Sequence, residues 1–314
     1  MTQSTAIRCH YWSEGRLIQN LGDALTPLIL QKLGYSSVNC QCNPLAVVNP
    51  DGCLLITGSL LSPINLETIL VSFTGTLDVW GCGWRGQPIP SELHRRIRFH
   101  AVRGPQTVTG LALASDIPIG DPALLCPYLW PAKVSCHGRN MVVPHWNRVY
   151  QMSARQRCYN TECNELLSVR VVGCKAPMNP SVLRPLLGAA KHWCVQGIPV
   201  WSITKTIERI GGANFVLTGS LHAAILAQAY GVPWAAYDDG YINAPAKWQD
   251  WAAYLGVELS FVRNLTEGRR WWDKQGQFGC IRSLAPLLRS FPYPNSTIDH
   301  LLQSNHLNGE QKQS

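Results

Sequence analysis

The amino-acid sequence predicts an α/β protein with two halves, each a parallel sheet covered by helices on both faces. Short apolar, β-rich runs alternate with helix-like stretches along most of the chain, a pattern typical of parallel sheets. The alternation is interrupted near residues 127–140, where Pro, Gly, Ser and Lys cluster between two apolar runs, and then restarts. We therefore expect an N-terminal lobe over residues 1–135, a C-terminal lobe over 136–300 and a polar tail over 301–314.

In the first half, four apolar runs have the composition of buried strands, and each ends in Gly or polar loop residues. These runs are residues 7–12, 53–57, 78–81 and 99–102. Between the first two, residues 23–33 place apolar side chains at helical intervals after the turn Asn20-Leu21-Gly22-Asp23. This order of strands and helices predicts parallel pairing.

The pattern resumes in the second half with five further strand candidates, at residues 141–144, 168–173, 199–203, 215–218 and 234–237. Two helices are expected over residues 179–196 and 222–230, the second ending before Gly231-Val232-Pro233. In open parallel sheets, ligands bind beyond the carboxyl ends of the strands. Two halves that face each other would bring those ends to a shared cleft, so the loops there are the place to look for chemistry.

Composition narrows the class of partner. Apolar residues make up 46% of the 314 residues and charged residues 15%, which excludes intrinsic disorder for the body of the chain. The net charge of +8 fits a polyanion or a small anionic substrate. Lys and Arg form no long block, because Arg95-Arg96 and Arg269-Arg270 are isolated pairs. A small anionic molecule is therefore favoured over nucleic acid.

The chain begins without a charged segment followed by an apolar stretch, and no apolar run approaches the length of a membrane helix. We therefore expect a cytoplasmic protein with no more than peripheral membrane association. The twelve cysteines contain no C-x-x-C pair, and Cys40-x-Cys42 lacks a second Cys/His pair at zinc-site distance. We expect most of them to be buried, reduced thiols, and we expect no metal site.

The sharpest candidate site follows the strand at residues 215–218. That strand leads into Gly219 and Ser220, and a helix of small residues then begins with His222 in its first turn. The free N–H groups of a helix start and the Ser220 hydroxyl can hold an anion. A His beside bound phosphate or carboxylate is favoured in its protonated form, which suits a general acid. The alternative is an N-cap Ser and a His satisfied by packing.

Two other strand ends carry cationic or titratable side chains. Arg103 ends the strand at 99–102 and precedes Gly104-Pro105, where its guanidinium could offer two donors to a carboxylate or phosphate. His145 follows the first strand of the second half and would face the cleft. Lys247 begins a helix and could reach an anionic donor. The alternatives are a surface Arg at a turn, a structural His and a Lys paired with Asp250.

A second group of residues suits a sugar. Asn20 and Asp23 offer oxygens and an amide that hydroxyl groups favour, although the same turn could merely cap a helix. Glycines around Ser59 and Trp84 permit close approach of the backbone to a ligand. Trp84 could stack on a sugar ring or belong to the core.

Eight short motifs follow one another in order along the chain. They are Asn20-x-Gly22-Asp23, Gly58-Ser59-Leu60, Trp80-Gly81-x-Gly83, Arg103-Gly104-Pro105, Gly120-Asp121-Pro122-Ala123, Pro144-His145, Ser220-Leu221-His222-Ala223 and Lys247-Trp248. In this order they resemble the polysaccharide pyruvyltransferase family, over about residues 10–260. Within the family, the sequence looks most like the enzymes of bacterial exopolysaccharide assembly.

The resemblance implies two Rossmann-like lobes that face each other across a cleft, as in GT-B enzymes, with phosphoenolpyruvate as co-substrate and no cofactor. It implies catalytic roles for His222, as general acid, and Arg103, as the main anion clamp. The remaining candidates divide into donor-binding Ser220, Gly219, His145 and Lys247, and acceptor-binding Asn20, Asp23, Ser59 and Trp84. One departure is Leu221, a position at which many members carry Arg.

The function implied is transfer of pyruvate from phosphoenolpyruvate to two hydroxyls of a sugar, in a bacterial polysaccharide or its lipid-linked precursor. The product would be a cyclic ketal, with phosphate released. Two alternatives remain open on the sequence. One is a GT-B-like glycosyltransferase that uses a nucleotide sugar, and the other is a catalytically inactive glycan-binding protein.

Overall fold

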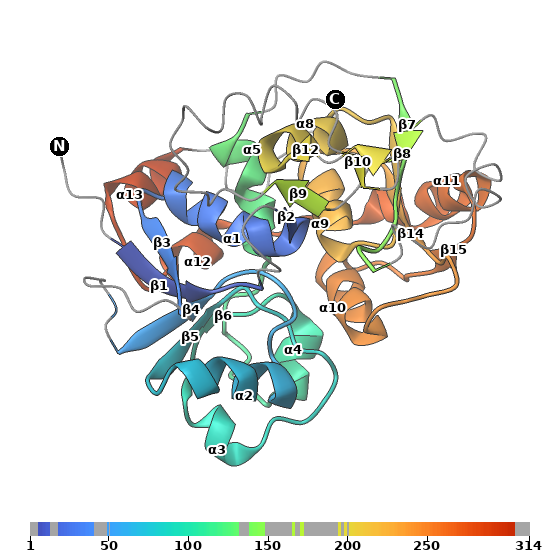
Figure 1. Ribbon diagram of the computed structural model, residues 1–314. Helices are drawn as coiled ribbons and strands as arrows, with labels where there is room; N and C mark the ends of the chain where they lie inside the picture. The colour runs from blue at the N-terminus through green and yellow to red at the C-terminus, as the bar shows by residue number, and fades with distance from the viewer. Residues whose placement is uncertain are drawn as a thin grey trace.

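The computed structural model describes residues 6–12, 18–40, 49, 51–131, 138–147, 165–166, 170–172, 194–195, 198–199 and 201–304 of the chain. Its architecture is mixed α/β, with two five-stranded sheets whose strands are all parallel. Figure 1 shows the first sheet at the lower left and the second at the right, with helices around both.

The first sheet has the strand order β3-β1-β4-β5-β6. Its strands are β1 (Ala6–His10), β3 (Ser36–Asn39), β4 (Gly52–Leu55), β5 (Thr76–Trp80) and β6 (Ile97–Ala101). Side chains alternate between its two faces, so that Leu54 joins one apolar cluster while Cys53 and Leu55 join another. Helices cover both clusters, which is why the strands are apolar along most of their length.

The helices of this half are α1 (Leu21–Lys32), α2 (Pro63–Ser72), α3 (Ser91–His94), α4 (Pro105–Gly110) and α5 (Cys126–Leu129), with a 3₁₀ turn η1 (Pro122–Leu125). In Figure 1, α2 and α3 lie below the sheet and α1 lies above it. Pro at the start of α2 and α4 replaces an N–H that would lack a helical partner.

The second sheet has the order β15-β14-β13-β7-β8. Its strands are β7 (Asn140–Val143), β8 (Glu165–Leu166), β13 (Phe215–Thr218), β14 (Trp234–Tyr237) and β15 (Phe261–Val262). The helices of this half are α8 (Ile203–Gly211), α9 (Leu221–Ala229), α10 (Pro245–Leu255) and α11 (Leu265–Lys274), with a 3₁₀ turn η3 (Gly276–Phe278). Leu217 and Val216 are fully buried between these layers.

Both sheets share one topology. Numbered along the chain, the strands of each sheet lie in the order second, first, third, fourth, fifth. This order reverses direction between the first and third strands, which are β1 and β4 in one sheet and β7 and β13 in the other. Ligands of open α/β sheets bind outside the carboxyl ends of the strands at such a point. The topology therefore indicates where a site would lie in each half.

Two connections join segments that are far apart in the sequence. Strand β2 (Ile18–Asn20) pairs antiparallel with β9 (Arg170–Val172), which pairs with β12 (Trp201–Ser202) in a small three-stranded sheet. After the second sheet, α12 (Ala285–Arg289) and α13 (Ser296–Gln303) return to the first. There the Trp80 indole N–H donates to the Leu287 carbonyl at 2.8 Å.

Most of the predicted strands and helices are confirmed, with β1, β4–β7, β9, β12, β13, β14, α1 and α9 each overlapping its predicted range. The strand predicted over residues 199–203 is wrong at its end, because helix α8 begins at Ile203. The helix predicted over residues 179–196 is wrong at its end. Residues Cys194–Val195 form strand β10, which pairs antiparallel with β11 (Ile198–Pro199), and the rest of that range lies outside the described residues. A β-branched residue beside Cys favours a strand, which the helical interpretation overlooked.

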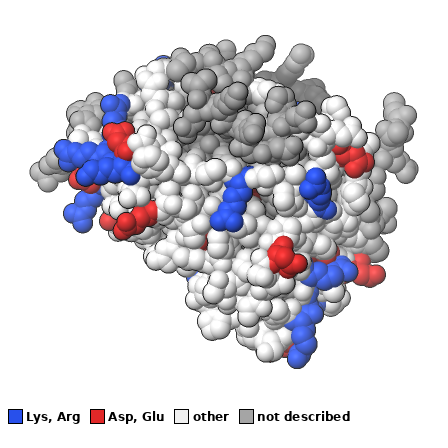
Figure 2. Space-filling model, turned by 180° about the vertical axis from the view of Figure 1, so that it is seen from behind, with Lys and Arg blue, Asp and Glu red and all other residues white. Residues whose placement is uncertain are grey.

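The lobe boundaries at 135 and 300 stay a prediction. Five of the six cysteines in the described part of the chain are buried and Cys280 is exposed; none of these is in a disulfide. No helix among the described residues has the length and apolar character that crossing a membrane requires. On the face seen in Figure 2, basic and acidic side chains are interspersed, without a continuous basic stripe over the described part.

The return of the C-terminal segment predicts a large contribution to stability from Phe291. Its ring is buried and packs edge-on against Trp80, with 4.7 Å between ring centroids. Phe291→Ala should lower the free energy of unfolding by about 3–5 kcal/mol, measured by urea titration, because it leaves a cavity beside the sheet. Phe278→Ala is the matched control, since Phe278 is 70% exposed and its loss should change stability by less than about 0.5 kcal/mol. Equal stability of the two variants would contradict this packing.

Candidate functional site

A pocket of about 250 Å³ lies at the carboxyl ends of the strands at both points of order reversal. Trp12 follows β1, Ser59 follows β4, His145 follows β7 and Ser220 follows β13. The full lining comprises Trp12, Asn20, Asp23, Gly58, Ser59, Leu60, Asn65, Arg85, His145, Trp146, Ser220, Leu221, His222, Asn243 and Lys247. Residues from both halves of the chain therefore form a single pocket.

The start of α9 forms one wall. The Thr218 hydroxyl accepts a hydrogen bond from the Ser220 backbone N–H at 2.9 Å, which fixes the turn between β13 and the helix. Ser220 is the N-cap residue, yet its side chain makes no capping hydrogen bond. The structure thus confirms Ser220 at the N-cap position without the usual side-chain hydrogen bond, and Ser220 is part of the pocket lining.

His222 lies one position into that helix, beside the helix α1. A Cβ at Gly22 would collide with the imidazole ring, so glycine is required there for the two helices to approach. The ring Nε2 is 3.7 Å from Oδ2 of the buried Asp121. Burial, together with the positive charges of Arg103 and Lys247, lowers the pKa of His222 to about 3. His222 is thus neutral at pH 7 while the pocket holds no anion.

Lys247 and Arg85 bring positive charge to the pocket. The Lys247 ammonium, on α10, donates to the Asn243 amide oxygen at 2.9 Å, and no ion pair joins it to a described carboxylate. Burial lowers the pKa of Lys247 to about 7, assisted by Arg103 and Arg85. Arg85 is half-buried in the loop after β5. An ammonium and a guanidinium that share a wall favour a bound anion.

His145 also lies in the lining. Its Nδ1 accepts a hydrogen bond from the Asn147 backbone N–H at 3.3 Å, and its ring contacts Tyr241 with centroids 5.5 Å apart. Burial lowers the pKa of His145 to about 3, with further contributions from Lys247 and Arg85. Gly219, predicted to bind the donor, is not in the lining. A Cβ at Gly219 would come within 3.0 Å of the His145 backbone nitrogen, so glycine permits the close approach of these two loops.

Arg103 is fully buried and lies behind the pocket wall. Its Nε donates to Asp250 Oδ2 at 3.1 Å and its Nη2 lies 3.0 Å from the same oxygen. A third nitrogen, Nη1, donates to the Ser59 hydroxyl at 2.8 Å. The guanidinium therefore already has a carboxylate partner, and it is not among the lining residues. Its charge still acts on the pocket, because it lowers the pKa values of His222 and Lys247.

The structure brings Asn20, Asp23 and Ser59 together in the lining, as the acceptor hypothesis expects. The Asp23 carboxylate accepts from the Asn20 amide at 3.0 Å, and burial raises its pKa to about 6. Trp84 lies outside the lining. Its indole N–H donates to the Gln87 carbonyl at 2.5 Å, and its ring packs where a side chain at Gly110 would be.

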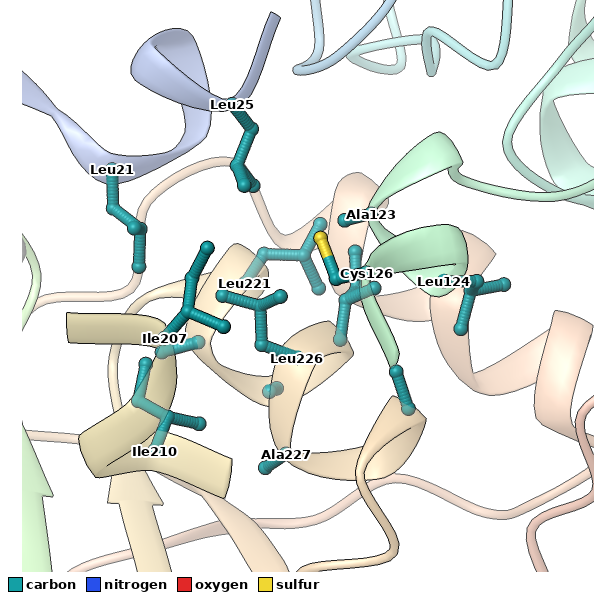
Figure 3. Close-up of a cluster of buried hydrophobic side chains, with 14 of the residues drawn as sticks. Leu21, Leu25, Ala123, Leu124, Cys126, Ile207, Ile210, Leu221, Leu226 and Ala227 are labelled. Carbon is teal, nitrogen blue, oxygen red and sulfur yellow. The ribbon is translucent and has the colours of Figure 1, made fainter. Parts of the chain in front are cut away.

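The surroundings of Leu221, the position at which many members of the family carry Arg, are largely apolar. Its side chain is buried in the apolar cluster that also contains Leu21, Ile207 and Leu226 (Figure 3). Leu221 also belongs to the pocket lining, in which Arg85 and Lys247 are the cationic side chains.

Sequence analysis missed Arg85, Trp12 and the partner of Arg103. Arg85 directly follows the Trp80-Gly81-x-Gly83 motif, and this proximity is the signal that could have identified it. Trp12 ends the first predicted strand, where a ligand would be expected. The Asp250 carboxylate gave no such signal, because 147 residues separate it from Arg103. Among the described residues, no group of three His, Cys, Asp or Glu side chains is placed to hold a metal ion.

Comparison with known proteins agrees with this order of motifs. The sequence profile of the polysaccharide pyruvyl transferase family matches residues 53–240. The succinoglycan biosynthesis protein ExoV of Rhizobium meliloti (strain 1021) is 30% identical over 189 residues, which cover 57% of this chain and 50% of ExoV. The chain belongs to the polysaccharide pyruvyl transferase family. It spans about half the length of the curated relative that it matches.

Two solved structures show a weaker likeness. An uncharacterized protein from Klebsiella pneumoniae has a TM-score of 0.41 at 12% identity, covering 82% of this chain and 92% of that one. A protein provisionally assigned as a UDP-N-acetylglucosamine 2-epimerase, from Listeria monocytogenes, has a TM-score of 0.33 at 12% identity, with coverages of 76% and 80%. Scores this low do not establish a shared fold.

The buried ion pair between Arg103 and Asp250 predicts that Asp250 is critical for stability. Asp250→Ala should lower the free energy of unfolding by about 3–5 kcal/mol, because Arg103 would be left charged and unpaired in the interior. The double variant Arg103→Met/Asp250→Leu should recover most of this loss, measured by urea titration. Asp273→Ala, which removes an exposed carboxylate on α11, is the control. If Asp250→Ala were as stable as the control, the pair would not hold the two segments together.

Proposed function

We propose that this protein transfers pyruvate from phosphoenolpyruvate to two hydroxyls of a saccharide, forming a cyclic ketal and releasing phosphate. The observation that carries the proposal is a pocket with two cations, a histidine and a helix start, at the ends of two parallel sheets. Membership of the family supports pyruvyl transfer in exopolysaccharide synthesis. We also propose that the two sheets belong to GT-B-like lobes on either side of this pocket.

The donor is a small molecule with a phosphate and a carboxylate. We place the phosphate against Arg85, Lys247 and the first turn of α9, where N–H groups without helical partners and the Ser220 hydroxyl face the pocket. His145 belongs to the same lining, and we assign it a contact with one of the two anionic groups. In this arrangement Arg103 acts through its charge and by fixing Ser59, while Arg85 and Lys247 contact the donor directly.

His222 acts as the general acid. A bound phosphate and carboxylate raise the pKa of His222 from its low value, because they offset Arg103 and Lys247. Its proton goes to the methylene carbon of the donor, and a methyl group forms. Positive charge then develops at the adjacent carbon, which an acceptor hydroxyl attacks. Asp121, 3.7 Å from the ring, orients the imidazole and stabilises its charged form.

The second half of the reaction replaces phosphate by oxygen. The carbon–oxygen bond to phosphate breaks, a second hydroxyl of the same sugar forms a new bond to that carbon, and the ketal closes. Each hydroxyl loses one proton as it bonds: one equivalent restores His222, and the other leaves with the phosphate. Asn20 and Asp23 orient the two hydroxyls, and the raised pKa of Asp23 suits a group that accepts a proton from them.

The residues named above supply the acid, the anion site and the hydroxyl partners, so the proposal requires neither a metal nor an organic cofactor. Phosphoenolpyruvate is an intracellular metabolite, so we place the reaction in the cytoplasm. The acceptor is a saccharide, either free or lipid-linked.

His222→Ala should reduce turnover by about two to four decades while leaving the fold intact, since it removes the proton donor. The assay measures phosphate released from phosphoenolpyruvate together with the mass of a pyruvate ketal on the acceptor. His300→Ala, an exposed histidine on α13, should retain full activity. Near-normal turnover of His222→Ala would remove His222 from the mechanism, and a hexose added to the acceptor instead would favour glycosyl transfer.

Binding of phosphoenolpyruvate should be accompanied by proton uptake. At pH 7.5 the free Lys247 is partly neutral and His222 is neutral, and a bound anion raises the pKa of both. The lysine contribution should make the affinity fall as pH rises above about 7, and the histidine contribution should do so as pH rises above about 3, each by up to about tenfold per pH unit. Calorimetric titration in two buffers of different ionisation enthalpy counts these protons.

Two variants identify which side chain takes up each proton when phosphoenolpyruvate binds. Lys247→Arg keeps its charge at all these pH values and should abolish the lysine contribution, whereas His222→Asn should abolish that of the histidine. Identical heats in both buffers, with affinity independent of pH, would contradict the donor site. A nucleotide sugar that binds where phosphoenolpyruvate does not would favour the glycosyltransferase alternative.

A further inference from the structure

One exposed aromatic side chain lines the pocket, and a second packs against a residue of the lining. The large apolar side chains exposed in the described part of the chain are Trp12, Ile64, Val71, Tyr241 and Phe278. Trp12 is 49% exposed and lines the pocket, and Tyr241 is 37% exposed and packs against His145 of the lining. A half-exposed indole in a pocket lining offers a ligand an apolar face and a polar N–H.

Each of these rings is connected to polar groups of the pocket. On one side, the backbone N–H of Trp12 donates to Asp23 Oδ1 at 3.1 Å, and Asp23 Oδ2 accepts from Asn20 at 3.0 Å. On the other, the Tyr241 hydroxyl accepts from Asn243 Nδ2 at 2.9 Å, and Asn243 Oδ1 accepts from Lys247. Hydrogen bonds thus fix the loops of both rings relative to the candidate acceptor and donor groups.

The pocket consequently has two chemical zones. The start of α9, Arg85 and Lys247 form an anionic-ligand zone. Trp12, Asn20 and Asp23 combine an apolar ring with a carboxylate and an amide. A pyranose ring matches the second zone, because its C–H face packs on an aromatic ring while its hydroxyls bond to carboxylate and amide oxygens.

We propose that Trp12 is the stacking surface for the acceptor sugar and that the ligand class is a hexopyranoside. This inference rests on the proposed function for its orientation. With the ring on Trp12, the hydroxyl edge lies toward Asn20 and Asp23, next to the zone that binds the donor. Trp12 thus takes the place of Trp84, which the sequence predicted to stack on the sugar ring.

The test uses the full chain and two simple probes, methyl β-glucopyranoside and methyl β-galactopyranoside, titrated by saturation-transfer difference NMR without phosphoenolpyruvate. The unmodified protein should bind at least one of them. Trp12→Ala should weaken its affinity by about threefold to tenfold and Trp12→Phe by less, because phenylalanine keeps a ring. Phe278→Ala, which removes an exposed ring outside the lining, should change nothing.

Calorimetric titration of Trp12→Ala with phosphoenolpyruvate separates this inference from the proposed function. An unchanged donor affinity combined with weaker glycoside binding supports a separate sugar subsite. If the unmodified protein binds glycoside through Trp12 but never binds phosphoenolpyruvate, the subsite stands and the proposed function fails. Glycoside affinity unchanged in Trp12→Ala, or no binding of either glycoside to the unmodified protein, would overturn the subsite.

Discussion

The buried pair of Arg103 and Asp250 is the interaction on which the site depends. It joins the loop after β6 to α10, two segments that 147 residues separate. Removing both charges from water is costly in free energy, and additional hydrogen bonds offset this cost. Thr107 donates two hydrogen bonds to the Asp250 carboxylate, and the Ser59 hydroxyl accepts one from the Arg103 guanidinium. Lys247 lies one turn before Asp250 on α10, so the pair fixes the helix that carries a pocket cation.

That constraint explains the electrostatics of the pocket. Arg103 is neutralised by Asp250, but it still belongs to a group of positive charges that lowers the pKa values of Lys247 to about 7 and of His222 to about 3. Burial is the larger cause in both cases, because the charged forms lose hydration there. Positive charges that are held away from water attract an anion more strongly than charges on a hydrated surface do. The pocket that lowers the pKa values of Lys247 and His222 therefore also stabilises a bound anion.

The sequence was most informative about local features. Apolar runs identified β4, β13 and α9, and the turn at Asn20 identified the start of α1, because periodicity and turn chemistry are properties of neighbouring residues. It was least informative about residues whose role depends on distant segments. Nothing near Arg103 indicates that its partner is Asp250, and nothing near Trp84 indicates that its ring packs on Gly110 and away from the pocket. The return of α12 to the first sheet likewise depends on tertiary packing around Trp80.

The electrostatics of the pocket also bear on the order of events in the proposed mechanism. Lys247, Arg85 and the start of α9 line the same pocket as Trp12, and Trp12 is 49% exposed. In the mechanism that we propose, entry of the anion raises the pKa of His222 and so provides the acid. The charged acid is then absent from the empty pocket and forms only when the donor binds, so donor binding and activation of the acid are a single event.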